Sequence, residues 1–234
     1  MVYKEEWEMN NQKSFVAQIV ICLLCLVGAI VMTIGATLEG MPVLTNKVPE
    51  LSDVLAESGE GKLPRGYVKM RVDALVDIYA TYTERNYIIT RKSDFYIAWL
   101  DDDSFITITV PQGHDSDVLD KIIDDTWSFA TGETNVLTDK AVEYYGFVQP
   151  LIDQANELYD ERLEECGIDK NENLVRRQMI KCSVNVKKDV WTGILFGVGL
   201  MIAIIIWFVS ILVKNSKASA QNVAPATGLD GVNF

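Results

Sequence analysis

A chain of 234 residues is long enough for one domain of ordinary size together with additional segments. Hydrophobic residues make up 49% of it although 23% of its residues are charged, so the apolar residues must be segregated from the charged ones. The formal net charge of −12 would repel phosphate backbones, so we expect no nucleic acid partner.

Two long uncharged runs lie near the two ends of the chain. Residues 14–36 and 190–213 each exceed the about 20 apolar residues that a helix needs to cross the hydrocarbon of a bilayer. The first run could instead be a cleaved signal peptide. However, the short N-terminal tail before it, residues 1–13, is not basic, and no A-x-A-like cleavage site comes after it. We therefore interpret both runs as transmembrane helices and residues 214–234, which are small and polar, as a disordered tail.

Two spans would place both termini on one side of a bilayer and the intervening residues on the other. The lysines near the span ends are balanced between the two sides. Because Lys13 abuts the first run whereas Glu39 follows it, we favour cytoplasmic termini and an extracytoplasmic domain in a multi-pass plasma-membrane protein. A cytoplasmic domain is the alternative.

The segment after the first span begins with a proline- and glycine-rich stretch. Residues 37–65 are interpreted as a membrane-proximal linker with one short helix candidate between Pro49 and Gly59. The next stretch, "YVKMRVDALVDIYATYT", alternates apolar and polar residues with a period of two. This pattern predicts a long, half-buried strand over residues 67–83 with a bend or bulge near Asp73.

Three consecutive aspartates separate the next two predicted strands, "SDFYIAWL" and "SFITITV". Aspartate is frequent in turns because its side chain accepts hydrogen bonds from the nearby backbone, so Asp101, Asp102 and Asp103 are expected to form a hairpin loop. A calcium loop would need an oxygen ligand and a glycine where the chain has Phe105 and Ile106. The aspartates are therefore only weak candidates for a metal site.

The remaining pattern adds helices and strands in alternation. An amphipathic helix is expected after His114, with Asp115, Ser116 and Asp117 as its cap and first turn. A strand over residues 141–148, a helix from Pro150 to Gly167, a polar loop at 169–180 and a strand over 179–188 follow. Residues 66–189 are thus predicted to form an α+β domain, a mainly antiparallel sheet with about two helices packed on one face. Its first and last strands are expected to pair.

Cysteines and glycines supply the candidate packing and cross-linking positions. The predicted domain contains Cys166 and Cys182, enough for one disulfide in an oxidising compartment, although two independent buried thiols are the favoured interpretation. Small residues in the apolar runs favour close packing of the helices, within one chain or by self-association. These residues are Gly28, Gly35, Gly193 and Gly197.

No fingerprint of an enzyme or of a cofactor site is present, so we expect neither catalysis nor a cofactor. His114 is the only histidine and is explained by its place before a helix. The hypothesis is a membrane-anchored interaction or accessory protein, a sensor or scaffold, that contacts the lipid bilayer and binds another membrane or envelope protein. An exposed aromatic patch at Tyr144, Tyr145 and Phe147 would fit this role. The alternative is a carboxylate-dependent hydrolase or cation-binding domain, with converging carboxylates around Asp101–Asp103 or Asp115.

The run "GYVKMRVDALVDIYATYT…SDFYIAWLDDDSFITITVP" between the two spans also resembles the β-rich core of uncharacterised two-pass membrane proteins from Gram-positive bacteria. The resemblance covers residues 14–213. It implies a bacterial plasma membrane and the same layout of spans and domain. It implies no functional residue, because that family has no assigned activity.

Overall fold

The computed structural model describes residues 2–85, 90–170 and 174–222 and divides the chain into two compact units. One unit holds the two ends of the chain, residues 1–38 and 191–234, and the other is the domain, Glu39–Val190. Helices α1 (Val2–Leu44) and α5 (Val186–Asn222) contribute to both units.

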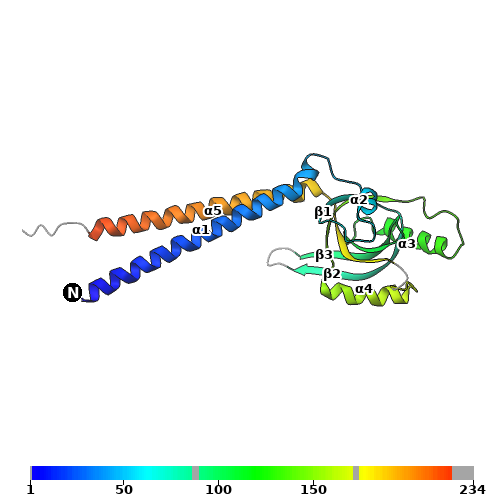
Figure 1. Ribbon diagram of the computed structural model, residues 1–234, viewed down its shortest axis with the longest axis horizontal. Coiled ribbons are helices and arrows are strands. Elements are labelled where there is room, and N and C mark those ends of the chain that lie inside the picture. Colours follow the sequence, from blue (N-terminus) through cyan, green and yellow to red (C-terminus); the bar gives the residue numbers. More distant parts are fainter. Residues whose placement is uncertain (1, 86–89, 171–173, 223–234) are drawn as a thin grey trace, which may run out of the picture. The chain divides into compact units, whose positions relative to one another are not determined.

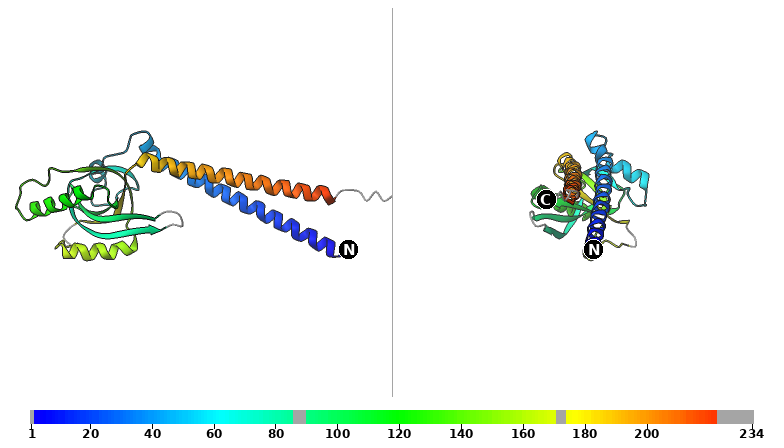
Figure 2. Two further views of the ribbon diagram at one scale, coloured as in Figure 1. Left: turned by 180° about the vertical axis from the view of Figure 1, so that it is seen from behind. Right: turned by 90° about the vertical axis from the view of Figure 1, so that its left-hand side faces the viewer.

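Within the first unit, α1 and α5 run antiparallel and side by side (Figures 1 and 2). Their buried residues recur every seven positions, at Cys22 and Ala29 on α1 and at Gly197, Ile204 and Ile211 on α5. A seam with this repeat is typical of helices that pack as in a left-handed coiled coil. The two helices therefore form a hairpin of their own.

The apolar stretches of both helices extend beyond the predicted spans. Ser14–Leu44 and Val186–Lys217 are long and apolar enough to cross a membrane, and only 11% and 17% of their most apolar windows are buried. The helix α1 continues past residue 36, through Gly40 and Pro42, and ends at Leu44, shortly before Asn46, whose φ of 54° is left-handed. Most apolar side chains of the pair point outwards.

In its described residues, the domain is built on one six-stranded sheet with the order β1-β5-β6-β4-β3-β2. All neighbouring strands are antiparallel except β4 and β6, which confirms the predicted α+β class with a mainly antiparallel sheet. The predicted pairing of the first and last strands is wrong, because β5 lies between β1 and β6. The strands are β1 (Gly66–Val72), β2 (Leu75–Arg85), β3 (Thr90–Trp99), β4 (Phe105–Pro111), β5 (Val142–Pro150) and β6 (Val175–Ser183).

The strand predicted over residues 67–83 bends sharply at its middle. Only Asp73 and Ala74 separate β1 from β2, although these two strands occupy opposite edges of the sheet. The sheet therefore curls, as Figure 1 shows. The break is held by the Leu75 N–H, which donates to Thr126 Oγ1 at 3.2 Å, and by the Trp99 N–H, which donates to the Ala74 carbonyl at 3.2 Å.

Helices cover both faces of the sheet, not the single face that we expected (Figures 1 and 2). Alternate residues of β3 enter different cores: Tyr96 and Ala98 pack with α2 (Leu51–Ser58) and α3 (Ser116–Ala130), whereas Phe95 and Ile97 pack with α4 (Asp153–Glu165). Central strands with apolar residues at consecutive positions need a cover on each side. This explains the two cores.

Residues 39–65, nearly all of the predicted linker 37–65, are part of the folded domain. Leu51, Val54 and Leu55 of α2 and the later Leu63 are buried in the first core. The segment predicted to be a linker thus contributes helix α2 and part of the first core to the domain. On the predicted helix after Pro150, two apolar side chains lie outside the core, since Ile152 is 37% and Leu158 45% exposed.

Candidate functional site

The three aspartates form the turn of the β3–β4 hairpin, as predicted. The Leu100 N–H donates to the Ser104 carbonyl at 2.9 Å, and Asp103 adopts a left-handed φ of 59° that aspartate tolerates. Oδ1 of Asp102 accepts hydrogen bonds from the Ser104 N–H at 3.2 Å and from the Ser104 hydroxyl at 2.5 Å. The carboxylate of Asp102 thereby closes the turn.

The other oxygen of Asp102 binds a buried arginine that the sequence did not reveal. Nη2 of Arg176 donates to Asp102 Oδ2 at 2.5 Å, and only 2% of the Arg176 side chain is exposed. The same guanidinium donates to the carbonyls of Gly59 and Gly61, each at 2.7 Å, and to the Ser104 hydroxyl at 2.9 Å. Partial burial raises the pKa of Asp102, but hydrogen bonds from Ser104 and Arg176 outweigh it and hold that pKa below its ordinary value.

Neighbouring carboxylates do not complete a metal site around Asp102. Asp101 and Asp103 are exposed, and with Glu60 they line an open depression of about 590 Å³ beside α2. Among the described residues, no group of three or more histidine, cysteine, aspartate or glutamate side chains is placed to hold a metal ion. The aspartate turn has a structural explanation in Arg176.

His114 precedes α3, as expected, but Asp115 does not cap this helix with its side chain. The residue occupies the N-cap position with a left-handed φ of 55° and makes no capping hydrogen bond. Its Oδ2 accepts from the Tyr144 hydroxyl at 2.9 Å and lies 3.2 Å from His114 Nε2. Tyr144 is buried, and its hydroxyl needs an acceptor there, which explains why the carboxylate turns away from the helix.

The two cysteines of the domain are free thiols and form no disulfide. Cys182 lies in the core beneath α3, whereas Cys166 packs against the core beneath α4, on the other face of the sheet. Burial raises the pKa of the Cys182 thiol to about 12 and also raises that of Cys166. The interpretation as two independent thiols therefore describes the structure.

Only one of the four glycines proposed for helix packing lies against the other helix. A side chain on Gly197 would meet Thr33 of α1, whereas a Cβ added at Gly28, Gly35 or Gly193 would meet no atom of another element within 4 Å. The seam follows the seven-residue repeat of Cys22 and Ala29. Gly28 is the residue before Ala29, and the rotation of the helix from one residue to the next turns it away from the seam.

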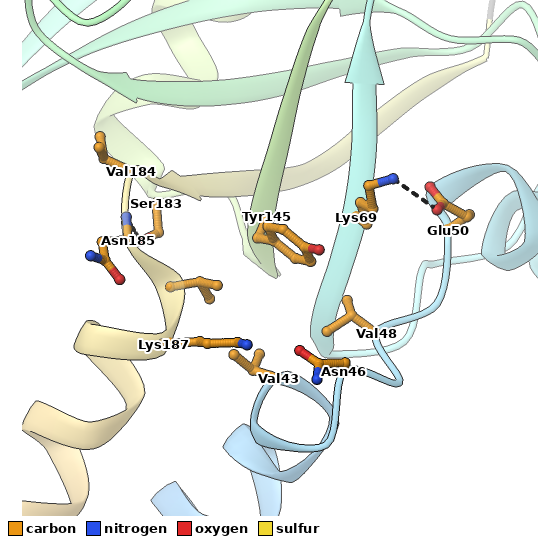
Figure 3. Close-up of a pocket in the computed structure, with 11 residues that line it drawn as sticks. Val43, Asn46, Val48, Glu50, Lys69, Tyr145, Ser183, Val184, Asn185 and Lys187 are labelled. Carbon is orange, nitrogen blue, oxygen red and sulfur yellow. Dashed lines mark hydrogen bonds and ion pairs between the residues drawn. The ribbon is translucent and has the colours of Figure 1, made fainter.

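A pocket of about 470 Å³ lies where the chain enters and leaves the domain (Figure 3). Three separate segments form its walls: the end of α1 with the turn after it, the outer face of β1 and β5, and the junction of β6 with α5. All of them belong to the domain unit. The lining residues are Val43, Asn46, Val48, Glu50, Lys69, Tyr145, Ser183, Val184, Asn185, Val186 and Lys187.

Two lysines of this pocket have different surroundings. Lys69 Nζ lies 3.3 Å from carboxylate oxygens of both Glu50 and Glu143, and hydrogen bonds to these two groups raise its pKa. Lys187 forms no ion pair with any described residue, and in Figure 3 its ammonium points towards the wall formed by Val43 and Asn46. The pocket thus offers one cation whose charge is not balanced by a neighbouring carboxylate.

The start of α5 is fixed beside this cation. Asn185 Oδ1 accepts from the Lys188 N–H at 3.1 Å, and the Ser183 hydroxyl donates to Asp189 Oδ2 at 2.5 Å. These bonds hold the first turn of the helix, whose positive dipole end faces the same region. Sequence reasoning missed the pocket because its walls come from three distant segments.

The aromatic patch expected at Tyr144, Tyr145 and Phe147 is divided between the two faces of β5. Tyr144 is buried in the core, whereas Tyr145 is 39% exposed on the outer face. Phe147 lies on that outer face too, with its ring centroid 4.9 Å from that of Tyr67 and the Arg65 guanidinium 5.4 Å above it. The outer face of β1 and β5 is therefore aromatic and basic.

Fold and site together define a class of protein, an α+β domain carried between two antiparallel apolar helices. A family model described as a domain of unknown function (DUF8577) matches residues 8–214, and the chain belongs to this family. The matched region contains Ser14–Leu44, the whole domain and all but the last three residues of Val186–Lys217. Searches of curated proteins and of solved structures found no match.

Proposed function

We propose that the protein is a membrane-anchored interaction protein, a sensor or scaffold subunit without catalytic activity, whose domain binds another membrane or envelope protein. The observation that carries the proposal is the exposure of apolar side chains along both long helices. Leu24 on α1 and Phe196 on α5 are 68% and 67% exposed. A surface of this kind is stable against lipid or another apolar helix, not against water.

The polar groups of these helices also suit a hydrocarbon environment. The Thr33 hydroxyl donates to the Ala29 carbonyl at 2.7 Å, and the Ser210 hydroxyl donates to the Ile206 carbonyl at 2.8 Å. Each hydroxyl is thereby satisfied within its own helix, which a bilayer core requires because it supplies no water. Both observations support the proposed membrane anchoring.

The edge of β2 is the surface that we assign to the partner. In the described part of the sheet, β2 is an edge strand that pairs only with β3. Tyr82 near its end is 45% exposed, and Ile78 is 38% exposed. An exposed strand edge with apolar side chains can accept an extended segment of a partner as an additional strand.

The hydrogen bonds that Asp102 accepts favour an interaction protein over a hydrolase. A general base or a metal ligand must have a free oxygen directed at its substrate or ion. Both oxygens of Asp102 accept hydrogen bonds from Ser104 and Arg176 instead. The carboxylate of Asp102, the best candidate for the hydrolase alternative, thus has a structural role in the hairpin turn.

Photo-crosslinking in intact cells tests the partner proposal. A photoreactive amino acid at Tyr82 on the β2 edge is expected to yield an adduct with another protein. Leu158 on α4 has the same exposed fraction, 45%, and provides the matched control, from which no adduct is expected. Absence of an adduct at Tyr82, together with purification of a lone monomer in mild detergent, would contradict the proposal.

We place both termini in the cytoplasm and the domain outside the plasma membrane of a bacterial cell, in line with the charge argument at Lys13 and Glu39. A membrane-impermeant maleimide should then label Cys166 and Cys182 in intact cells after mild denaturation. A variant with serine at both positions is the control for specificity. Labelling that requires lysis would reverse the orientation.

A further inference from the structure

The pocket beside the helix ends lies next to both points at which the chain leaves the domain. Val43 and Lys187 are within about one helical turn of Glu39 and Val190, the first and last residues of the domain unit. The headgroup layer of a bilayer is only about 5–8 Å thick on each side of the hydrocarbon. With α1 and α5 in a membrane, covalent connection alone keeps the pocket near this layer.

The lining of the pocket is amphiphilic, like the region of a lipid where the headgroup joins the chains. Val43, Val48 and Val186 supply apolar surface, and the Asn46 amide and the Tyr145 hydroxyl supply hydrogen-bonding groups. The volume of about 470 Å³ is in the range of pockets that bind small molecules. The space is sufficient for a headgroup with its glycerol unit.

The pocket contains one lysine without an ion-pair partner among the described residues, although the protein is acidic. The chain carries a net charge of −12, yet the ionisable lining residues are two lysines and one glutamate. Lys69 is balanced by Glu50 and Glu143, so the cation left to attract an anion is Lys187. The positive end of the α5 dipole lies beside this lysine, and Asp189 in the first turn of the helix offsets part of its field.

From this combination we infer that the pocket binds the phosphate group of a phospholipid headgroup, with Lys187 as its ionic ligand and Asn46 as a hydrogen-bond donor. The inference rests on the proposed membrane anchoring but is independent of the protein partner. A phosphate ester could also come from a soluble molecule. The lipid is the source to which we commit, because the pocket is tethered beside the bilayer and its walls are partly apolar.

Native mass spectrometry of the full chain in detergent, titrated with phosphatidylglycerol, tests the inference. Lys187→Gln is expected to weaken lipid binding about tenfold, since a charge-assisted hydrogen bond is lost. Lys188→Gln removes the same charge one residue away, at a side chain that does not line the pocket, and is expected to weaken binding less than about twofold. Equal losses in the two variants would overturn the inference.

A second variant tests the site without changing its charge. Asn46 has a left-handed φ of 54°, so Asn46→Gly keeps the turn and removes only the amide. Binding of phosphatidylglycerol should weaken about threefold, the effect of one neutral hydrogen bond. Unchanged binding in this variant would remove Asn46 from the site.

Two competitor ligands identify the source of the phosphate, and an extraction experiment tests the membrane anchoring separately. Diacylglycerol, which lacks the phosphate, is expected not to compete, and sn-glycerol 3-phosphate is expected to bind far more weakly than the lipid. Glycerol phosphate that binds as tightly as the lipid would overturn the choice of a lipid. Release of the chain from membranes by alkaline carbonate would refute the anchoring itself, whereas retention without Lys187-dependent binding would refute only the pocket.

Discussion

Arg176→Met removes a buried guanidinium that holds together three separate parts of the domain. The side chain donates to Asp102 and Ser104 of the hairpin turn and to the carbonyls of Gly59 and Gly61 after α2. Methionine fills similar space but leaves these acceptors without a donor. Breaking a buried ion pair costs about 3–5 kcal/mol, which is a large part of the about 5–15 kcal/mol that stabilises a typical domain.

The free energy of unfolding can be measured by urea denaturation of the full chain in mild detergent, followed by near-ultraviolet circular dichroism. Arg177→Met is the matched control, because Arg177 is the next residue and its side chain is 41% exposed in an ion pair with Asp160. An exposed pair of this kind contributes at most about 1 kcal/mol. A loss at Arg176 no greater than that at Arg177 would refute the structural role of the buried arginine.

The same network predicts a dependence on pH. The pKa of Asp102 is lower in the folded protein than in the unfolded chain, where it is about 3.9. Its stabilising contribution is therefore present above about pH 4 and is lost as the pH falls through the folded value. The difference in stability between the wild type and Asp102→Asn should shrink below about pH 4, and a difference that grows there would contradict this assignment.

Three further changes test the helix seam and the core. Gly197→Leu should destabilise the helix pair in detergent by about 1–3 kcal/mol more than Gly28→Leu, because only Gly197 faces the other helix; equal melting temperatures would contradict the seam. Cys182, kept as the sole cysteine, should react with maleimide at pH 8 at less than about a tenth of its denatured rate, since burial raises its pKa to about 12; equal rates would exclude burial. Tyr144→Phe should lower the unfolding free energy by about 0.5–1.5 kcal/mol through the lost bond to Asp115, and an unchanged free energy in urea denaturation would contradict that bond.

The parts of the fold that depend on local pattern were predictable from the sequence. The alternation around Asp73 predicted both the strand and its bend, and the aspartates between two apolar runs predicted the turn. Period and turn chemistry act over a few residues, so one sequence is enough to recognise them. The α+β class followed from the order of these elements.

The arrangement of the strands was not predictable in the same way. Nothing local distinguishes a sheet in which β1 pairs with β6 from the observed one, in which β5 lies between them. The parallel pairing of β4 with β6 joins segments that the chain connects through α3, β5 and α4. Such pairings are decided by which apolar faces can be covered together, a property of the whole domain.

The pocket was missed for a related reason. Lys187 and Lys188 are equivalent in the sequence, and only the folded chain shows that one of them lines a cavity. Its neighbours Asn46 and Tyr145 arrive from the turn after α1 and from β5. The residues that line the pocket are thus spread over the sequence without a recognisable spacing.

The buried polar residues of β6 explain why the segment after α1 belongs to the domain. The alternation that places Ile180 and Cys182 in the first core extends backwards to Arg176 and Gln178. Gln178 accepts from the Leu63 N–H at 2.7 Å and donates to the Leu63 carbonyl at 2.8 Å, and Arg176 binds the carbonyls that precede it. These two side chains supply hydrogen-bond partners to backbone groups of residues 59–63, as a neighbouring strand would. The wall that carries Glu50 is consequently tied to the sheet at the far end of α2, and the pocket is a feature of the folded domain rather than of a loose connection.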